Sequence, residues 1–152
     1  MPLFPFQKKR EFFTPEQQNV MVEAIQRAEK NTSGEVRFFV ESKCEYVDPV
    51  ERAKEIFFGL KMDQTKERNA VLLYMAMDDH QLALFADEGI YSRLGKQYWN
   101  DEVKKIISHI TNNNYTGGVC NIISDIGEAL KKEIPYESDD KNELPDEIIF
   151  GN

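Results

Sequence analysis

The longest apolar run in the chain is Ala70-Val71-Leu72-Leu73-Tyr74-Met75-Ala76-Met77. Odd and even positions of this run are both apolar, which is typical of a strand that is buried on both faces in a sheet covered by helices. The run is much shorter than the ~20 residues that a membrane-spanning helix needs. We therefore predict a central β-strand over residues 70–77.

The segments on either side of this run predict the rest of the sheet. Asp78-Asp79-His80 has the composition of a turn, after which residues 81–86 return as a hairpin strand. Residues 35–41 are rich in Val and Phe and predict an earlier strand, followed by a helix that starts at Asp48-Pro49. Because strand-helix-strand units cross over in the right-handed sense, strands 35–41 and 70–77 should run parallel and strand 81–86 antiparallel.

Further helices flank this unit. Thr14-Pro15-Glu16-Gln17 has the form of a capping box and begins a helix that ends before Gly34. After Tyr91 the apolar spacing is helical again, with a short segment around residues 92–96 and two long helices separated near residues 112–118. This order predicts an α/β fold, a three-layer αβα sandwich with a small mixed central sheet. We assign residues 1–135 to that domain and residues 136–152 to an acidic C-terminal tail.

Composition limits the classes of partner. The chain has 152 residues and a formal net charge of −8, with a pI near 4.9. Nucleic acids and anionic membranes need clustered Lys and Arg, so neither is an expected partner. The N-terminus lacks the pattern of a signal peptide, and Cys44 and Cys120 are expected to stay reduced. We expect a cytoplasmic monomer whose partners are divalent cations and, through its acidic tail, a basic protein.

One end of the predicted sheet gathers oxygen-bearing side chains. They are Glu35 before the first strand, Glu67 and Asn69 before the second, Asp87 and Glu88 after the third, and Asp101 at a nearby helix start. Calcium takes six to eight such oxygen ligands, and magnesium binds the same hard donors with more water. Acids in strand-end loops are equally typical of ordinary solvated loops. The sequence therefore leaves open a calcium or magnesium site or a purely solvated edge.

The tail offers two more ligand candidates. Its acids would keep it solvated and disordered by composition, but Leu144 and the run Ile148-Ile149-Phe150 are apolar anchors that a solvating tail does not need. If the tail docks on the domain, Asp139 or Asp140 could supply ligands to the metal site.

The opposite end of the sheet carries Glu41 and Asp78-Asp79-His80. These residues could hold a transition metal, or form an ordinary hairpin turn. Common catalytic signatures are missing: Gly95-Lys96-Gln97 lacks the spacing of a phosphate-binding loop, and there is no Gly-x-Ser-x-Gly elbow. The sequence thus contains no recognisable catalytic motif, which leaves open whether the protein is an enzyme.

Three motifs together resemble the TPM domain family. They are Thr32-Ser33-Gly34-Glu35, Arg68-Asn69-Ala70-Val71-Leu72-Leu73 and Asp87-Glu88-Gly89-Ile90, and the resemblance covers about residues 13–132. Asp48-Pro49-Val50-Glu51-Arg52-Ala53 is similar to the small, soluble bacterial branch of that family. Ala70 departs from the pattern, because a glycine is usual there.

The resemblance implies an αβα sandwich, divalent cation binding, and the acid phosphatase activity reported for chloroplast relatives. Our leading hypothesis is a divalent-metal-binding regulatory or adaptor domain, with calcium or magnesium ordering the loops around the site. The alternative is a metal-dependent acid phosphatase-like hydrolase, in which the cation polarises a phosphoryl oxygen and activates water. A third possibility is an interaction domain whose acidic tail docks a basic partner.

Overall fold

A computed structural model describes residues 12–30, 32–111, 114–134 and 147–151. Its elements follow one another along the chain as α1 (Pro15–Glu29), β1 (Glu35–Glu41), α2 (Pro49–Gly59), a 3₁₀ turn η1 (Met62–Gln64), β2 (Ala70–Ala76), β3 (Gln81–Ala86), α3 (Glu88–Leu94), α4 (Lys96–Thr111), α5 (Tyr115–Glu133) and β4 (Ile149–Phe150).

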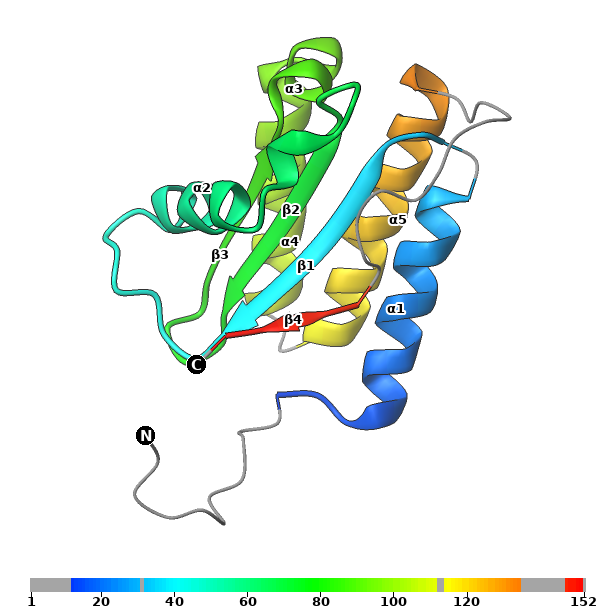
Figure 1. Cartoon of the computed structure of the whole chain (residues 1–152). Helices are drawn as coiled ribbons and strands as arrows, with labels where there is room; N and C mark the ends of the chain where they lie inside the picture. The colour runs from blue at the N-terminus through cyan, green and yellow to red at the C-terminus, as the bar shows by residue number, and fades with distance from the viewer. Residues whose placement is uncertain (1–11, 31, 112–113, 135–146, 152) are drawn as a thin grey trace.

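The sheet has the strand order β3-β2-β1-β4. β1 and β2 are parallel, with Glu35 opposite Ala70, and β3 is antiparallel to β2, with Ala86 opposite Val71. These directions confirm the crossover and hairpin predicted from sequence. β4 was not predicted as a strand; it pairs in parallel with β1 on the side away from β2. Figure 1 shows it as a short arrow beside β1.

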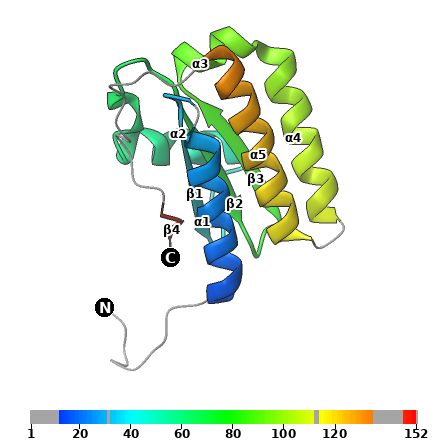
Figure 2. The same cartoon turned by 90° about the vertical axis from the view of Figure 1, so that its right-hand side faces the viewer.

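Helices cover both faces of the sheet. α1, α5 and α4 form one layer, in which they lie side by side (Figure 2), and α2 lies on the opposite face (Figure 1). Every residue of β2 is buried. Val71, Leu73 and Met75 join the core under α1 and α5, and the alternate residues of β2 join the core under α2. The predicted αβα sandwich and the doubly buried central strand are therefore confirmed.

Local sequence explains where two helices begin. Thr14 accepts a hydrogen bond from the Gln17 amide (3.1 Å) while the Gln17 side chain accepts one from the Thr14 amide (2.9 Å), which completes the predicted capping box. Asp48 caps α2 through the Val50 amide (2.9 Å), with Pro49 as the first helical residue.

Two parts of the fold differ from the sequence prediction. The segment between α2 and β2 contains the turn η1, which is not among the elements predicted from sequence; Met62 is fully buried there and brings the chain onto the core under α2. The short helix after β3 begins at Glu88 instead of near Ser92, because Asp87 accepts a hydrogen bond from the Glu88 amide and caps it. No helix in the described parts of the chain is long and apolar enough to cross a membrane.

Candidate functional site

The end of the sheet where β1 and β2 begin carries most of the predicted metal ligands. The register places Glu35 beside Ala70, and the Asp87 amide donates to the Ala70 carbonyl (2.9 Å). The fold therefore brings Glu35, Asn69 and Asp87 to the same edge, as the sequence predicts. We call the group formed here by Asp63, Glu67, Arg68, Asp87 and Glu88 the acidic edge.

Asp87 is the buried centre of the acidic edge. Only 2% of it is exposed, and Arg68 donates from Nε to its Oδ2 (2.7 Å) and from Nη2 to its Oδ1 (2.8 Å). The Oδ1 atom also accepts the Glu88 amide (2.8 Å), so Asp87 caps α3 and holds Arg68 at once. The hydrogen bond to Asp87 raises the pKa of Arg68, and this bond is the largest cause of the shift.

Two further acids lie near the same guanidinium. Glu88 is 73% exposed, and its Oε1 lies 3.2 Å from Arg68 Nη1. Asp63 also interacts electrostatically with Arg68 and raises its pKa. Within the acidic edge, one cationic group is therefore shared among three of the four carboxylates, and one of these three is buried.

The backbone around Arg68 is held in one shape. Arg68 has φ of 52°, in the left-handed region that most residues avoid. Its carbonyl accepts the Ile90 amide (3.2 Å), and a Cβ on Gly89 would lie 2.4 Å from the Glu67 carbonyl oxygen. The first turn of α3 thus rests directly on the loop before β2, which explains why a glycine follows Asp87-Glu88.

The remaining predicted ligands differ in burial. Glu35 and Asn69 are both buried, and the Asn69 side-chain amide donates to the Ser33 carbonyl (2.9 Å). The Asn69 Oδ1 atom has no hydrogen-bond partner in the part of the chain that the structure describes. Glu67 is exposed.

Asp101 lies on α4, is exposed, and accepts a hydrogen bond from the Gln97 side chain (2.8 Å). Within the described ranges of the chain, it makes no hydrogen bond or ion pair with the acidic edge. Asp139 and Asp140 lie outside the described residues. Among the described residues, no three His, Cys, Asp or Glu side chains are close enough together to hold an ion.

The opposite end of the sheet carries a second polar network that sequence reasoning did not identify. Glu41 is buried and accepts hydrogen bonds from Arg52 Nε and Nη2 (2.8 Å each) and from the Tyr74 hydroxyl. Arg52 also pairs with Glu55, which in turn bonds to Tyr46. Burial, and then the bond to Glu41, raises the pKa of Tyr74. The network borders a cavity of about 420 Å³.

The hairpin residues at this end have their own partners. The Asp79 Oδ2 atom accepts the Cys44 amide (2.7 Å), and His80 Nδ1 lies 2.9 Å from the Tyr115 hydroxyl. Glu41 is therefore committed to Arg52, and Asp79 to the loop after β1. The sequence contains one indication of the pair between Glu41 and Arg52: Arg52 lies near the start of the predicted helix that follows strand 35–41.

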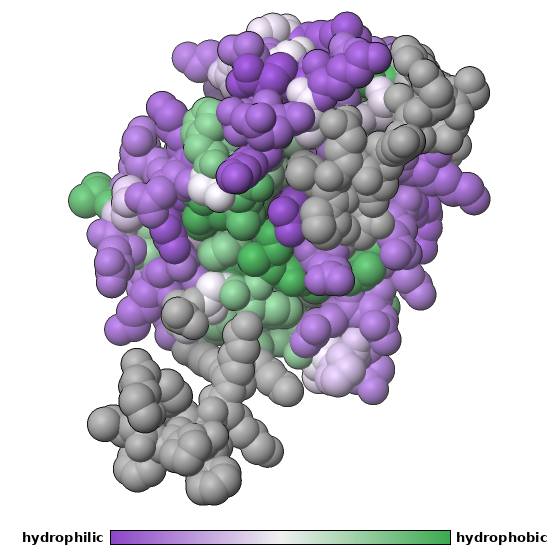
Figure 3. Space-filling view, in the orientation of Figure 1, coloured by the Kyte–Doolittle hydropathy of each residue, from purple (hydrophilic) through white to green (hydrophobic). Residues whose placement is uncertain are grey.

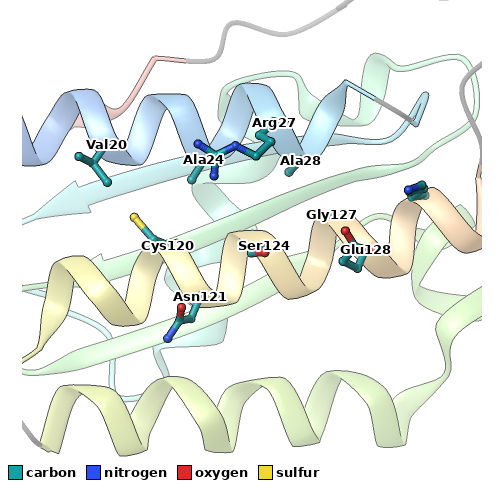
Figure 4. A pocket seen from close by; sticks show the side chains of 10 residues that line it. Val20, Ala24, Arg27, Ala28, Cys120, Asn121, Ser124, Gly127 and Glu128 are labelled. Atoms are coloured by element: carbon teal, nitrogen blue, oxygen red, sulfur yellow. The ribbon is translucent and has the colours of Figure 1, made fainter.

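A groove of about 250 Å³ lies along the contact between α1 and α5. Figure 4 shows the Cys120 thiol on α5 pointing towards α1, with Arg27 further along the groove. Burial raises the pKa of Cys120, and the nearby Arg27 opposes that shift. Cys44 and Cys120 are both free thiols.

Comparisons with known proteins agree with this architecture. The family model of the TPM domain matches residues 7–129. The NMR structure of the BA42 protein from the psychrophilic bacterium Bizionia argentinensis is similar to this chain, with a TM-score of 0.87 and 38% sequence identity over 95% of this chain and 99% of that one. No curated protein matches the chain.

Two other NMR structures share the fold at low sequence identity. The N-terminal domain of the cg2496 protein from Corynebacterium glutamicum has a TM-score of 0.65 at 10% identity, over 86% of this chain and 84% of that one. The N-terminal domain of a protein from P. gingivalis has a TM-score of 0.60 at 16% identity, over 80% and 78%. The family match, the long similarity to BA42 and the observed sandwich together show that the chain belongs to the TPM domain family.

Proposed function

We propose that this TPM domain is a divalent-cation-binding regulatory or adaptor domain, and that calcium or magnesium binds at the acidic edge in place of the Arg68 guanidinium. The observation that supports the proposal is the sharing of one arginine among Asp87, Glu88 and Asp63. Negative charge at this point already requires a cation, and the chain itself supplies one.

Burial makes Asp87 the centre of the proposed site. A carboxylate with 2% exposure needs a countercharge, because an unpaired buried charge is strongly unfavourable. Arg68 supplies it, but its own side chain is 37% exposed and its guanidinium can move into water on a flexible stem. A hard cation could then take its place, since carboxylate oxygens are the ligands that calcium and magnesium prefer.

The exchange would require the loops to rearrange, since the acids do not converge in the arrangement described here. Asp87 would supply the first ligand, and the exposed carboxylates of Glu88 and Glu67 could swing towards it. Asn69 Oδ1 and Glu35, buried at the same edge, are the further oxygen donors that we propose. Asp87 also caps α3, so cation binding would act on the position of that helix and on the loop before β2.

A binding role agrees with the state of two of the buried carboxylates at the ends of the sheet, Glu41 and Asp87. Both oxygens of Glu41 accept from Arg52, and both oxygens of Asp87 accept from Arg68. A carboxylate whose oxygens are engaged by a guanidinium, or by a cation that replaces it, is poorly placed to take a proton from a nucleophile. We therefore favour regulation or scaffolding over hydrolysis as the role of the cation.

Calorimetric titration of the chelator-treated full chain with calcium and with magnesium tests the proposal. Asp87→Asn should abolish most of the binding heat, and Arg68→Gln should tighten binding because it removes the competing cation. Asp79→Asn at the opposite edge is the matched control and should bind as the wild type does. At about a hundred times its dissociation constant, a cation stabilises the folded state by ~2.7 kcal/mol. The melting temperature should then rise by roughly 5–10 °C.

The proposal fails if neither cation produces binding heat or a thermal shift in the wild type. It also fails if Asp79→Asn removes the effect while Asp87→Asn retains it, because the site would then lie at the hairpin edge.

A further inference from the structure

The side of β1 away from β2 is covered only in part by regular pairing in the described chain. β4 contributes two residues, with Phe39 opposite Ile149 and Val40 opposite Phe150, whereas β2 pairs with β1 along its whole length. The Gly151 amide extends the pairing by donating to the Val40 carbonyl (2.6 Å). Nearer its start, the Val36 amide donates to Glu29 Oε2 of α1 (2.8 Å) instead of to a strand. We call residues 147–151 the strap.

The strap packs on both faces of the sheet at once. Ile148 and Phe150 pack against the core under α1 and α5, and Ile149 packs against the core under α2. All three side chains remain partly exposed. In the space-filling view, apolar surface is concentrated in the middle of the face that carries β1 and β4, with hydrophilic residues around it (Figure 3).

Two features make the β1 edge selective for this segment. Arg37 on β1 is only 8% exposed, and Glu147 at the start of the strap is the acid that acts on it most strongly. At the other end of the strap, a Cβ on residue 151 would lie 2.8 Å from Phe39 Cζ and 3.0 Å from Glu41 Cβ. The edge is therefore occupied by an acid, then three apolar residues, then a glycine whose position leaves little room for a side chain.

We propose that this side of β1 is a strand-binding edge that accepts residues 147–151 of a second copy of the chain in exchange for its own strap. An exposed sheet edge binds extended segments through main-chain hydrogen bonds, with side-chain pockets that give specificity. The segment that meets the requirements of this edge is the strap, and every copy of the chain carries one. Exchange of identical elements replaces each lost contact with the same contact.

The covalent connection sets the balance between the two states. Residues 135–146 join α5 to the strap, and that length of chain can span up to ~40 Å when extended. A segment tethered by a connection of only twelve residues has a high effective concentration, in the millimolar range when the tether can span the distance. The strap of the same chain thus occupies the edge at ordinary concentrations, and a second copy competes only when that docking is weakened. This inference is independent of the proposed cation site.

A labelled peptide provides the first test. The probe is a fluorescent synthetic peptide of residues 143–152, and its binding is followed by anisotropy. It is titrated into the full wild-type chain and into full-length Gly151→Val, in which the close approach to Phe39 and Glu41 should weaken docking of the chain's own strap. Gly151→Val should bind the peptide at least ~10-fold more tightly than the wild type, because the tethered competitor is lost. Gly59→Ala, a change on α2 where an added Cβ meets nothing within 4 Å, should match the wild type.

Peptide variants show whether the recognition is specific. A peptide with Gly151→Val and another with Glu147→Arg should each bind Gly151→Val protein at least ~10-fold more weakly than the natural sequence, since each removes one of the two selective contacts. If hydrogen exchange shows that β2 of Gly151→Val protein is not protected, full-length Ile149→Asp replaces it with the same expected result.

Sedimentation velocity then tests exchange between copies. Gly151→Val retains the edge and loses the strap, whereas Arg37→Gln retains the strap and weakens the edge. Each should be monomeric alone, and an equimolar mixture at ~100 µM should contain a dimer, because one chain supplies what the other lacks. Equal peptide affinity of wild type and Gly151→Val, or a mixture that stays monomeric, would overturn the proposal.

Discussion

Replacement of Gly89 by alanine should destabilise the domain, because the first turn of α3 leaves no room for a side chain there. The new Cβ would lie 2.4 Å from the Glu67 carbonyl oxygen and 2.6 Å from that of Arg68. Both neighbours are backbone atoms, and the Arg68 carbonyl is already bonded to the Ile90 amide, so neither can move without disturbing the start of β2. Relief of the clash must displace α3.

The size of the effect follows from what overpacking costs. Forced shifts of this kind typically destabilise a protein by ~1–3 kcal/mol. For a domain of this size each ~1 kcal/mol lowers the melting temperature by about 2–4 °C, so Gly89→Ala should melt roughly 2–12 °C below the wild type. Urea unfolding followed by circular dichroism gives the free energy directly.

Gly59→Ala is the matched control for this prediction. It also adds one methyl group to a helix, but nothing lies within 4 Å of the added Cβ. Alanine in a helix is favoured over glycine by roughly 0.5–1 kcal/mol, so this variant should be as stable as the wild type or slightly more stable. If Gly89→Ala unfolds within about 0.5 kcal/mol of the wild type, the close approach of α3 to the loop before β2 is wrong.

Three further predictions concern ionisable groups and catalysis. Glu102 lies on α4 and is buried, and burial raises its pKa above the ordinary value near 4.5. The folded state therefore binds this proton more tightly than the unfolded state, and it loses stability as the pH rises from about 4.5 through the folded pKa. Glu102→Gln should remove this loss, so urea unfolding from pH 4 to 8 should show the two chains diverging as the pH rises. In a double-mutant cycle, Glu41→Gln and Arg52→Met should each lower the free energy of unfolding. Their coupling energy should be about 1–3 kcal/mol, because the two residues form one ion pair around a buried carboxylate. Additive effects on the free energy of unfolding would show that the pair is not coupled. We expect no turnover of simple phosphate esters at ~1 s⁻¹ or faster, and any weaker activity should vanish with a chelator; a pure sample that exceeds this rate would instead support the metal-dependent phosphatase.

The acidic edge shows how far a candidate site can be predicted from sequence. The sequence correctly placed Glu35, Asn69 and Asp87 at one end of the sheet, because the crossover rule determines which strand ends meet. It did not show that Arg68 binds both oxygens of Asp87, 19 residues away. Arg68 stands between two of the predicted ligands, Glu67 and Asn69, and nothing in its sequence position indicates that it pairs with Asp87.

Local patterns in the sequence determined the elements that depend on nearby residues. Two helix starts are specified by the capping residues Thr14 and Asp48, whose side chains accept hydrogen bonds from free backbone N–H groups. The central strand is specified by the uninterrupted apolar run at residues 70–77, because a strand that is apolar on both faces must be buried on both. The αβα order follows from these elements.

Tertiary structure alone decided which charges pair and how the edge of β1 is covered. The ion pairs are Glu41 with Arg52 and Asp87 with Arg68. Each pair forms because the fold brings the two residues together in space. Sequence position alone does not select these partners, since a long arginine side chain can reach many groups. β4 has two residues, too few to produce a periodic pattern, and it becomes a strand only because β1 offers unpaired backbone groups and two apolar faces beside it.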